Sequence, residues 1–139
     1  MINFHYETRF EIKDSNKHEV WLNKICDSES FELGDLNYIF CDDEYLLDIN
    51  KRYLQHDTYT DIITFDYTTG KTLSGDIYIS IERVKENSLQ FNVSFENELL
   101  RVMAHGILHL MGYKDKDEKH VAEMRAKEEE KIKLFHVEQ

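Results

Sequence analysis

Residues 94–115, SFENELLRVMAHGILHLMGYKD, decide the fold of this chain. Between Leu99 and Met111, apolar side chains occupy nearly every side of the expected helix. A helix of this kind belongs at the centre of a small protein, because it has little polar surface to present to water. Ser94 is placed to cap its N-terminus, and the acidic residues of the first turn complement the helix dipole. The sequence therefore predicts a central, buried helix.

Two histidines, His105 and His109, interrupt the apolar surface of this helix. Their spacing of four residues puts both imidazoles on one face, where they can reach a single metal ion. Gly112 can then reverse the chain in a left-handed turn, and Asp115 comes back as a third ligand. Three protein ligands and an open position are typical of a catalytic zinc. We predict one Zn²⁺ per chain, held by His105, His109 and Asp115.

The third ligand has competing interpretations. Asp115 could instead cap the final helix, although Asp117 can fill that role as well. His120 is the rival ligand, but its expected place one turn into the final helix puts it farther from the histidine pair. An ordinary structural role for the pair is disfavoured, because a buried ring nitrogen without a partner costs about 1–3 kcal/mol.

The residue after the first histidine is Gly106. At this position the H-E-x-x-H metallopeptidases carry the glutamate that activates water. A metallopeptidase is therefore a weaker alternative, even though the spacing H-x-x-x-H-x-x-G-x-x-D is similar to that of the metzincins. No side chain of the motif is an evident general base, so the catalytic residue is unknown. The proton of the attacking water has to be managed by the metal-bound hydroxide or by a substrate phosphate. Gly106 itself indicates close approach of a strand or substrate, or plain helix packing.

Outside the central helix, helical and extended patterns are interspersed. We predict further helices at about residues 15–26, 42–54, 82–91 and 118–134, and strands at 36–41, 61–67 and 75–81, with short extended segments at 2–7 and 9–12. Together they predict an α+β fold that forms a single small domain over residues 1–139. A mixed sheet of about four strands would pack with helices around the central metal-binding helix.

The chain is acidic, with 17 basic and 28 acidic residues and a formal net charge of −11. This balance argues against nonspecific coating of nucleic acid, which relies on neutralising phosphates. It leaves room for a nucleic-acid enzyme with a local basic rim. Two acidic runs, residues 42–44 and 128–130, are expected on solvated faces.

The sequence predicts a cytoplasmic protein. No apolar run approaches the length of a membrane span, and the N-terminal stretch MINFHYETRF has no basic-then-apolar signal pattern. Cys26 and Cys41 have no C-x-x-C partner and are expected to be reduced and buried.

Three motifs carry a resemblance to a known family. His105–Asp115 resembles the signature H-G-x-L-H-L-x-G-Y-D-H of the YbeY family of bacterial metal-dependent endoribonucleases and rRNA maturation factors. Tyr53–Phe65, YLQHDTYTDIITF, is similar to the family's segment Y-R-x-x-D-x-P-T-D-V-L-S-F, and Leu73–Ser80, LSGDIYIS, to its G-D-I-x-I strand. In register, the resemblance runs from about residue 36 to residue 129.

The resemblance implies a single-strand-specific endoribonuclease that acts in rRNA processing, at the 3′ end of small-subunit 16S rRNA, and in ribosome quality control. It implies zinc-assisted phosphodiester hydrolysis in the cytoplasm, with single-stranded RNA, rRNA precursors, ribosomal particles and ribosomal proteins as partners, and no membrane. The two histidine ligands fall on His105 and His109, and the third histidine position falls on Asp115. Thr60 and Asp61 in the second motif are candidate substrate-binding residues that could orient substrate or a ligand histidine. Their alternative role is to cap the following strand.

The chain departs from the family pattern at three positions. Asp115 replaces a histidine, Tyr59 stands where proline is usual, and Leu54 replaces an arginine expected near the scissile phosphate. The cations that could substitute are Lys51, Arg52 and Arg101. The loss at Leu54 keeps open a second function, that of a non-catalytic ribosome-assembly factor with a structural metal.

Overall fold

A four-stranded mixed sheet forms the base of the computed structural model, which describes residues 1–137. Its strands are β1 (Ile2–Tyr6), β2 (Glu32–Cys41), β3 (Ile62–Asp66) and β4 (Thr72–Ser80), in the spatial order β1-β2-β4-β3. β1 and β4 each pair with β2 in parallel, whereas β3 pairs with β4 antiparallel. The predicted mixed sheet of about four strands is confirmed, and β3 lies at its edge.

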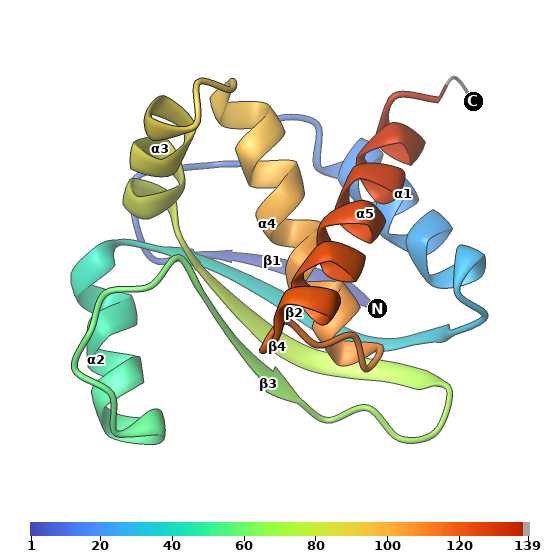
Figure 1. Cartoon of the computed structure of the whole chain (residues 1–139), viewed down its shortest axis with the longest axis horizontal. Helices are drawn as coiled ribbons and strands as arrows, with labels where there is room; N and C mark the ends of the chain where they lie inside the picture. Colours follow the sequence, from blue (N-terminus) through green and yellow to red (C-terminus); the bar gives the residue numbers. More distant parts are fainter. Residues whose placement is uncertain (138–139) are drawn as a thin grey trace.

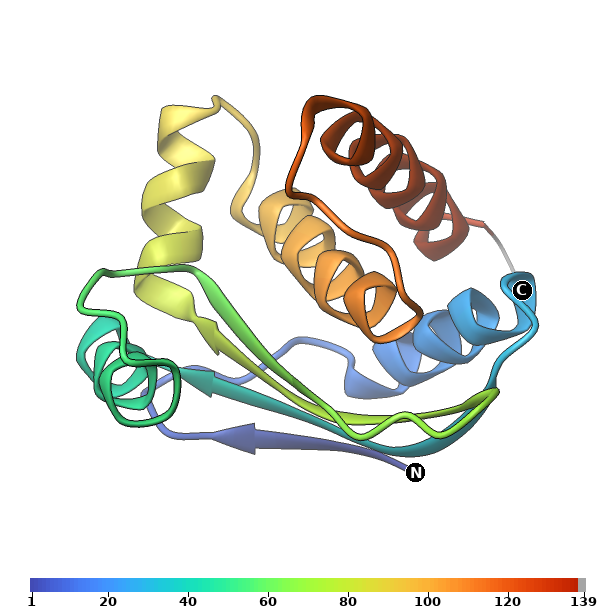
Figure 2. The same cartoon turned by 60° about the horizontal axis from the view of Figure 1, so that its bottom comes forward.

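Five helices accompany the sheet: α1 (Ser15–Ser28), α2 (Asp43–Leu54), α3 (Ile81–Gln90), α4 (Phe95–Leu110) and α5 (Glu118–Phe135). Figures 1 and 2 show α1, α3, α4 and α5 over one face of the sheet, with α4 in the middle of the group. α2 packs at one end of the sheet, where Leu46 and Ile49 meet Ile63 of β3. Ile77 and Ile79 of β4 point to the face that α4 covers and join the main core with it.

The central helix forms as the sequence predicts. The Ser94 hydroxyl accepts a hydrogen bond from the Asn97 amide at 3.0 Å, and α4 begins at the next residue, Phe95. At the other end, Gly112 has a φ of 103°, a left-handed conformation that suits glycine. The Gly112 amide donates to the His109 carbonyl at 3.0 Å, and the Tyr113 amide donates to the Leu108 carbonyl at 3.1 Å. These bonds end the helix and turn the chain back along it.

Three sequence predictions about strands need correction. Residues 9–12 do not form a strand, because Phe10 packs its ring edge-on against Phe40 and Phe95 instead of pairing its backbone. β2 begins at Glu32, well before residue 36, and an irregularity in its pairing with β4 lies between Leu33 and Leu36. The strand predicted at 75–81 begins at residue 72 and ends at residue 80, since residue 81 is already the first of α3.

Two expectations from composition hold within residues 1–137. Cys26 and Cys41 are free and buried, with the pKa of each thiol raised by burial. No helix in this part of the chain combines the length and apolar character that crossing a bilayer requires.

Close contact between α4 and the sheet depends on Gly106. A Cβ atom at this position would lie 2.9 Å from Cγ2 of Ile77 and 3.0 Å from Cδ1 of Ile62. The missing side chain therefore lets α4 settle onto β3 and β4, which is the close approach of a strand that the sequence predicted. A side chain at position 106, where H-E-x-x-H peptidases carry glutamate, would therefore point into the core of this fold.

We expect Gly106→Ala to lower the free energy of unfolding by about 1–2 kcal/mol. The overpacking against Ile77 destabilises the fold by more than the higher helix propensity of alanine stabilises it. Urea unfolding followed by circular dichroism measures the change. An unchanged or higher midpoint would show that α4 has room to move away from the sheet.

Candidate metal centre

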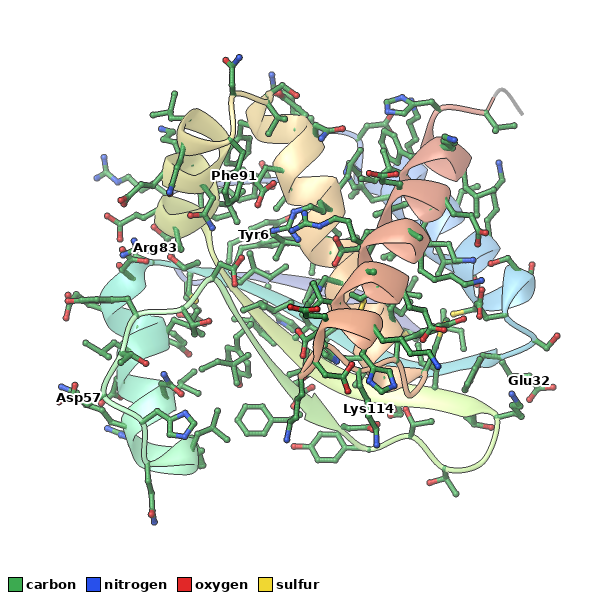
Figure 3. The ribbon with its side chains drawn as sticks, in the orientation of Figure 1. Tyr6, Glu32, Asp57, Arg83, Phe91 and Lys114 are labelled. Atoms are coloured by element: carbon green, nitrogen blue, oxygen red, sulfur yellow. The ribbon has the colours of Figure 1, made fainter. Side chains whose placement is uncertain are left out.

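Three side chains converge at the C-terminal end of α4. Nε2 of His105 lies 2.9 Å from Nε2 of His109, because residues four apart project from one face of the helix. Oδ2 of Asp115 lies 3.2 Å from the first of these nitrogens and 3.3 Å from the second. The loop after Gly112, in which Figure 3 labels Lys114, carries Asp115 back to the helix. The structure thus brings together the three residues predicted as ligands, whose role as ligands stays a prediction.

The other nitrogen of each imidazole faces a hydrogen-bond acceptor. Nδ1 of His105 lies 2.5 Å from Oε2 of Glu128, and Nδ1 of His109 lies 2.9 Å from the carbonyl oxygen of Tyr113. Both Nδ1 atoms therefore act as donors, and in the neutral form of each imidazole this places the lone pair on Nε2. In that form, two nitrogen lone pairs and a carboxylate oxygen face one another. Such a set of donors fits a cation.

The spacing of the three donor atoms also fits a first-row divalent ion. Ligands about 2.0–2.1 Å from a tetrahedral centre are separated from one another by about 3.3 Å. The observed separations are 2.9, 3.2 and 3.3 Å. Little movement would be needed to close the set around an ion.

The structure assigns the α5 cap, the alternative role considered for Asp115, to Asp117, and it pairs the rival ligand His120 with the same Asp117. Asp117 caps α5, since its Oδ1 accepts the His120 amide at 2.9 Å. Nδ1 of His120 lies 2.8 Å from Oδ2 of the same Asp117. Within residues 1–137, the group of side chains able to share one ion consists of His105, His109 and Asp115.

A cleft of about 480 Å³ opens in front of these side chains. Thr60 and Asp61, the predicted substrate-binding residues, line this cleft, and their contact with substrate stays a prediction. Burial raises the pKa of the Asp61 carboxyl, an effect that the charge of Arg101 opposes. The remaining lining residues come from α2, the loop after it and β3: Asn50, Leu54, His56, Thr58, Tyr59, Ile62, Ile63 and Thr64.

The cations named as substitutes for the family arginine do not line the cleft, although Arg101 contacts the lining residue Asp61 at 3.8 Å. Lys51 pairs with Asp57 at 3.5 Å, on the outer side of α2 in Figure 3, and Arg52 pairs with Asp48 at 3.1 Å. The Arg101 side chain is only 16% exposed and is surrounded by carboxylates. Among the described residues, no lysine or arginine lines the cleft.

Glu128 contacts the predicted ligand His105 and is a residue of the site that sequence reasoning missed. It belongs to the acidic run 128–130, which was predicted to be solvated, yet its side chain is only 2% exposed. α5 turns Met124, Glu128 and Lys131 into the core at a spacing of four and three residues. The helical spacing of these three residues indicated a buried face of α5. Because two of the three are charged, a hydropathy pattern does not reveal that face.

A second buried network holds the loop that carries Asp115. The Tyr113 hydroxyl donates to Oε1 of Glu29 at 2.7 Å, and Lys131, with 1% of its side chain exposed, donates to Oε2 at 2.7 Å. Burial acts to raise the pKa of Glu29, but hydrogen bonds from Lys131, Tyr113 and Lys127 lower it to about 2. The Tyr113 carbonyl that orients His109 is thereby anchored to the end of α1.

A small α+β protein with three convergent donor atoms in an open cleft belongs to the class of candidate metal-dependent hydrolases. The family model described as Endoribonuclease YbeY matches residues 2–136, and the chain belongs to this family. An Endoribonuclease YbeY of Flavobacterium johnsoniae is 58% identical over 139 residues, which is 100% of both chains. One from Flavobacterium psychrophilum is 56% identical, over 100% of this chain and 99% of the relative. The solution structure of a Thermotoga maritima protein is similar with a TM-score of 0.68 and 31% identity, covering 97% of this chain and 89% of that one.

We expect Glu29→Gln to destabilise the protein by about 3 kcal/mol at pH 7, because the buried Lys131 loses the less exposed of its two carboxylate partners. A carboxyl whose pKa is about 2 in the folded state, against an ordinary 4.5, stabilises the fold above pH 4.5. That stabilisation disappears as the pH falls from 4.5 towards 2. The difference between wild type and variant, measured by urea unfolding across this window, should therefore shrink.

Glu130→Gln is the matched control. Glu130 also contacts Lys131, at 2.6 Å, but its side chain is 55% exposed, so its loss should cost less than about 1 kcal/mol. A Glu29→Gln deficit that stays constant down to pH 2.5 would contradict the prediction.

Proposed function

We propose that the chain is a single-strand-specific, metal-dependent endoribonuclease. Its role would be 3′-end maturation of small-subunit 16S rRNA and ribosome quality control in the cytoplasm. The observation that carries the proposal is the convergence of three lone-pair donors from His105, His109 and Asp115 at an open cleft. Membership of a family whose curated relatives are named endoribonucleases supports RNA as the substrate class.

The proposal extends to the cofactor, the partners and the domain. One Zn²⁺ per chain would be held by the three side chains, since two imidazoles and a carboxylate are ligands that zinc accepts. Single-stranded RNA, rRNA precursors or ribosomal particles, with ribosomal proteins, would be the partners. Residues 1–139 would act as one domain.

A bound divalent ion supplies Lewis acidity for a phosphate and makes a water molecule more acidic. The chain itself orients the ligands, through Glu128 on His105 and the Tyr113 carbonyl on His109. Thr60 and Asp61 line the cleft, where a hydroxyl and a carboxyl can contact ribose or phosphate groups.

The lining of the cleft makes RNA affinity depend on the ion. Asp61 and Asp115 contribute negative charge, while the described lining residues include no lysine or arginine. The same observation favours a second candidate function, a ribosome-assembly factor with a structural metal. Cleavage by purified protein separates the two functions.

We expect chelator-stripped wild-type protein to take up one equivalent of Zn²⁺. His105→Ala, His109→Ala and Asp115→Ala should each weaken uptake by at least about 100-fold, because each removes one of three ligands. Titration against a chromophoric chelator gives the affinities. His120→Ala is the control and should bind as wild type does; a loss of affinity there, with Asp115→Ala unaffected, would transfer the third-ligand role to His120.

We expect the zinc-loaded protein to cleave a single-stranded RNA that spans the 3′ end of small-subunit rRNA. His109→Ala should lower the rate by at least about 100-fold with the fold retained, because the ion leaves with its ligand. Gel analysis of end-labelled RNA measures the rate, and a duplex of the same sequence should stay intact.

Equal trace activity in wild type and His109→Ala would exclude the nuclease and favour the assembly factor. Chelator-sensitive cleavage of a peptide panel, without cleavage of RNA, would favour the metallopeptidase instead.

A further inference from the structure

The two histidines of the metal centre have partners of different charge. Nδ1 of His105 donates to a carboxylate, that of Glu128, whereas Nδ1 of His109 donates to a neutral peptide carbonyl. An anionic acceptor on one ring nitrogen raises the electron density on the other and fixes the orientation of the ring. The two imidazoles are therefore unequal as ligands, and the stronger donor is His105.

Glu128 is held in this place from both sides. Its Oε2 accepts from His105 at 2.5 Å, while its Oε1 accepts from Arg101 at 3.2 Å. The side chain is 2% exposed, so water does not compete for either oxygen. The guanidinium compensates the charge of the buried carboxylate, and the short contact limits how far the His105 ring can turn.

Glu98 provides an internal comparison within the same cluster. It is also buried, with a side chain 2% exposed, and it accepts from Arg101 at 2.7 and 3.0 Å. The contacts of the Glu98 carboxylate in the described structure go to Arg101 and not to His105. Two buried carboxylates thus share one arginine, and one of them also touches the metal centre.

We propose that Glu128 is a positioning residue of α5 that sets the metal affinity of the centre through His105. The inference rests on the proposed metal site and goes beyond it, because it assigns a function to a residue outside the ligand set. α5 contributes no ligand, yet through Glu128 its docking onto α4 determines how strongly the ligands hold the ion.

Glu128→Gln tests the proposal, since glutamine keeps the shape of the side chain and removes its charge. We expect the affinity for Zn²⁺, measured by competition with a chromophoric chelator, to fall about 10- to 100-fold. The visible absorption spectrum of the Co²⁺-loaded protein should shift as well, because it reports the donor strength of the ligands. Glu98→Gln should leave affinity and spectrum as in wild type, even if it lowers the unfolding midpoint of the metal-free protein. Exposed Glu129→Gln should change none of these quantities.

Glu128→Asp keeps the test decisive if glutamine in the buried cluster prevents folding. The shorter side chain keeps its charge beside Arg101 and withdraws from His105, so the affinity should again fall. Wild-type affinity in the folded Glu128 variants, or an equal fall in Glu98→Gln, would overturn the proposal. Wild-type protein that binds no stoichiometric metal would overturn the proposed metal site and this inference together, whereas metal binding without RNA cleavage would overturn the proposed nuclease alone.

Discussion

Four imidazole nitrogens project from one face of α4, and each of them needs a hydrogen-bond partner or a cation. The rest of the site follows from that constraint. Two of the nitrogens are satisfied from within the chain, by Glu128 and by the carbonyl of Tyr113. The other two are aimed at each other and at Asp115, an arrangement that a cation satisfies. Placing α5 and the preceding loop against α4 therefore completes the hydrogen bonding of the helix as well as its packing.

This constraint explains why so much charge is buried where α5 meets its neighbours. Glu128 and Lys131 face inward from one side of α5, although the helix as a whole is strongly polar. Each has a partner of opposite charge, Arg101 for the first and Glu29 for the second. Burial of such pairs adds little net stability compared with apolar residues, but it fixes one arrangement of the helices, because any other would leave a charge unpaired. The network on Glu29 also reaches Tyr113, so the fold and the ligand geometry share the same contacts.

Local rules were sufficient to predict the parts of the site that lie close together in sequence. The cap at Ser94, the helical spacing of His105 and His109, and the turn at Gly112 all depend on neighbouring residues, and the structure has each of them. Glu128 was missed because its partner lies 23 residues away and because it begins the acidic run 128–130. The segment at residues 9–12 was predicted as extended from its composition, but its conformation is decided by where Phe10 packs in the finished core.

Because the cleft has no lysine or arginine in its described lining, the proposed ion would have to bind the substrate as well as activate it. Leu54 lies in the lining where the family pattern has a cation, and Arg101 directs its guanidinium to Glu98 and Glu128 behind the cleft. A polyanion approaching this acidic chain meets Asp61, whose carboxylate Arg101 contacts at 3.8 Å from behind the cleft, and no lysine or arginine among the described lining residues. Attraction of the phosphate must therefore come mainly from the ion itself, which would both bind the substrate and activate it. Because Glu128 tunes one of the ligands of that ion, a residue that never meets RNA would influence substrate binding and catalysis through the same contact.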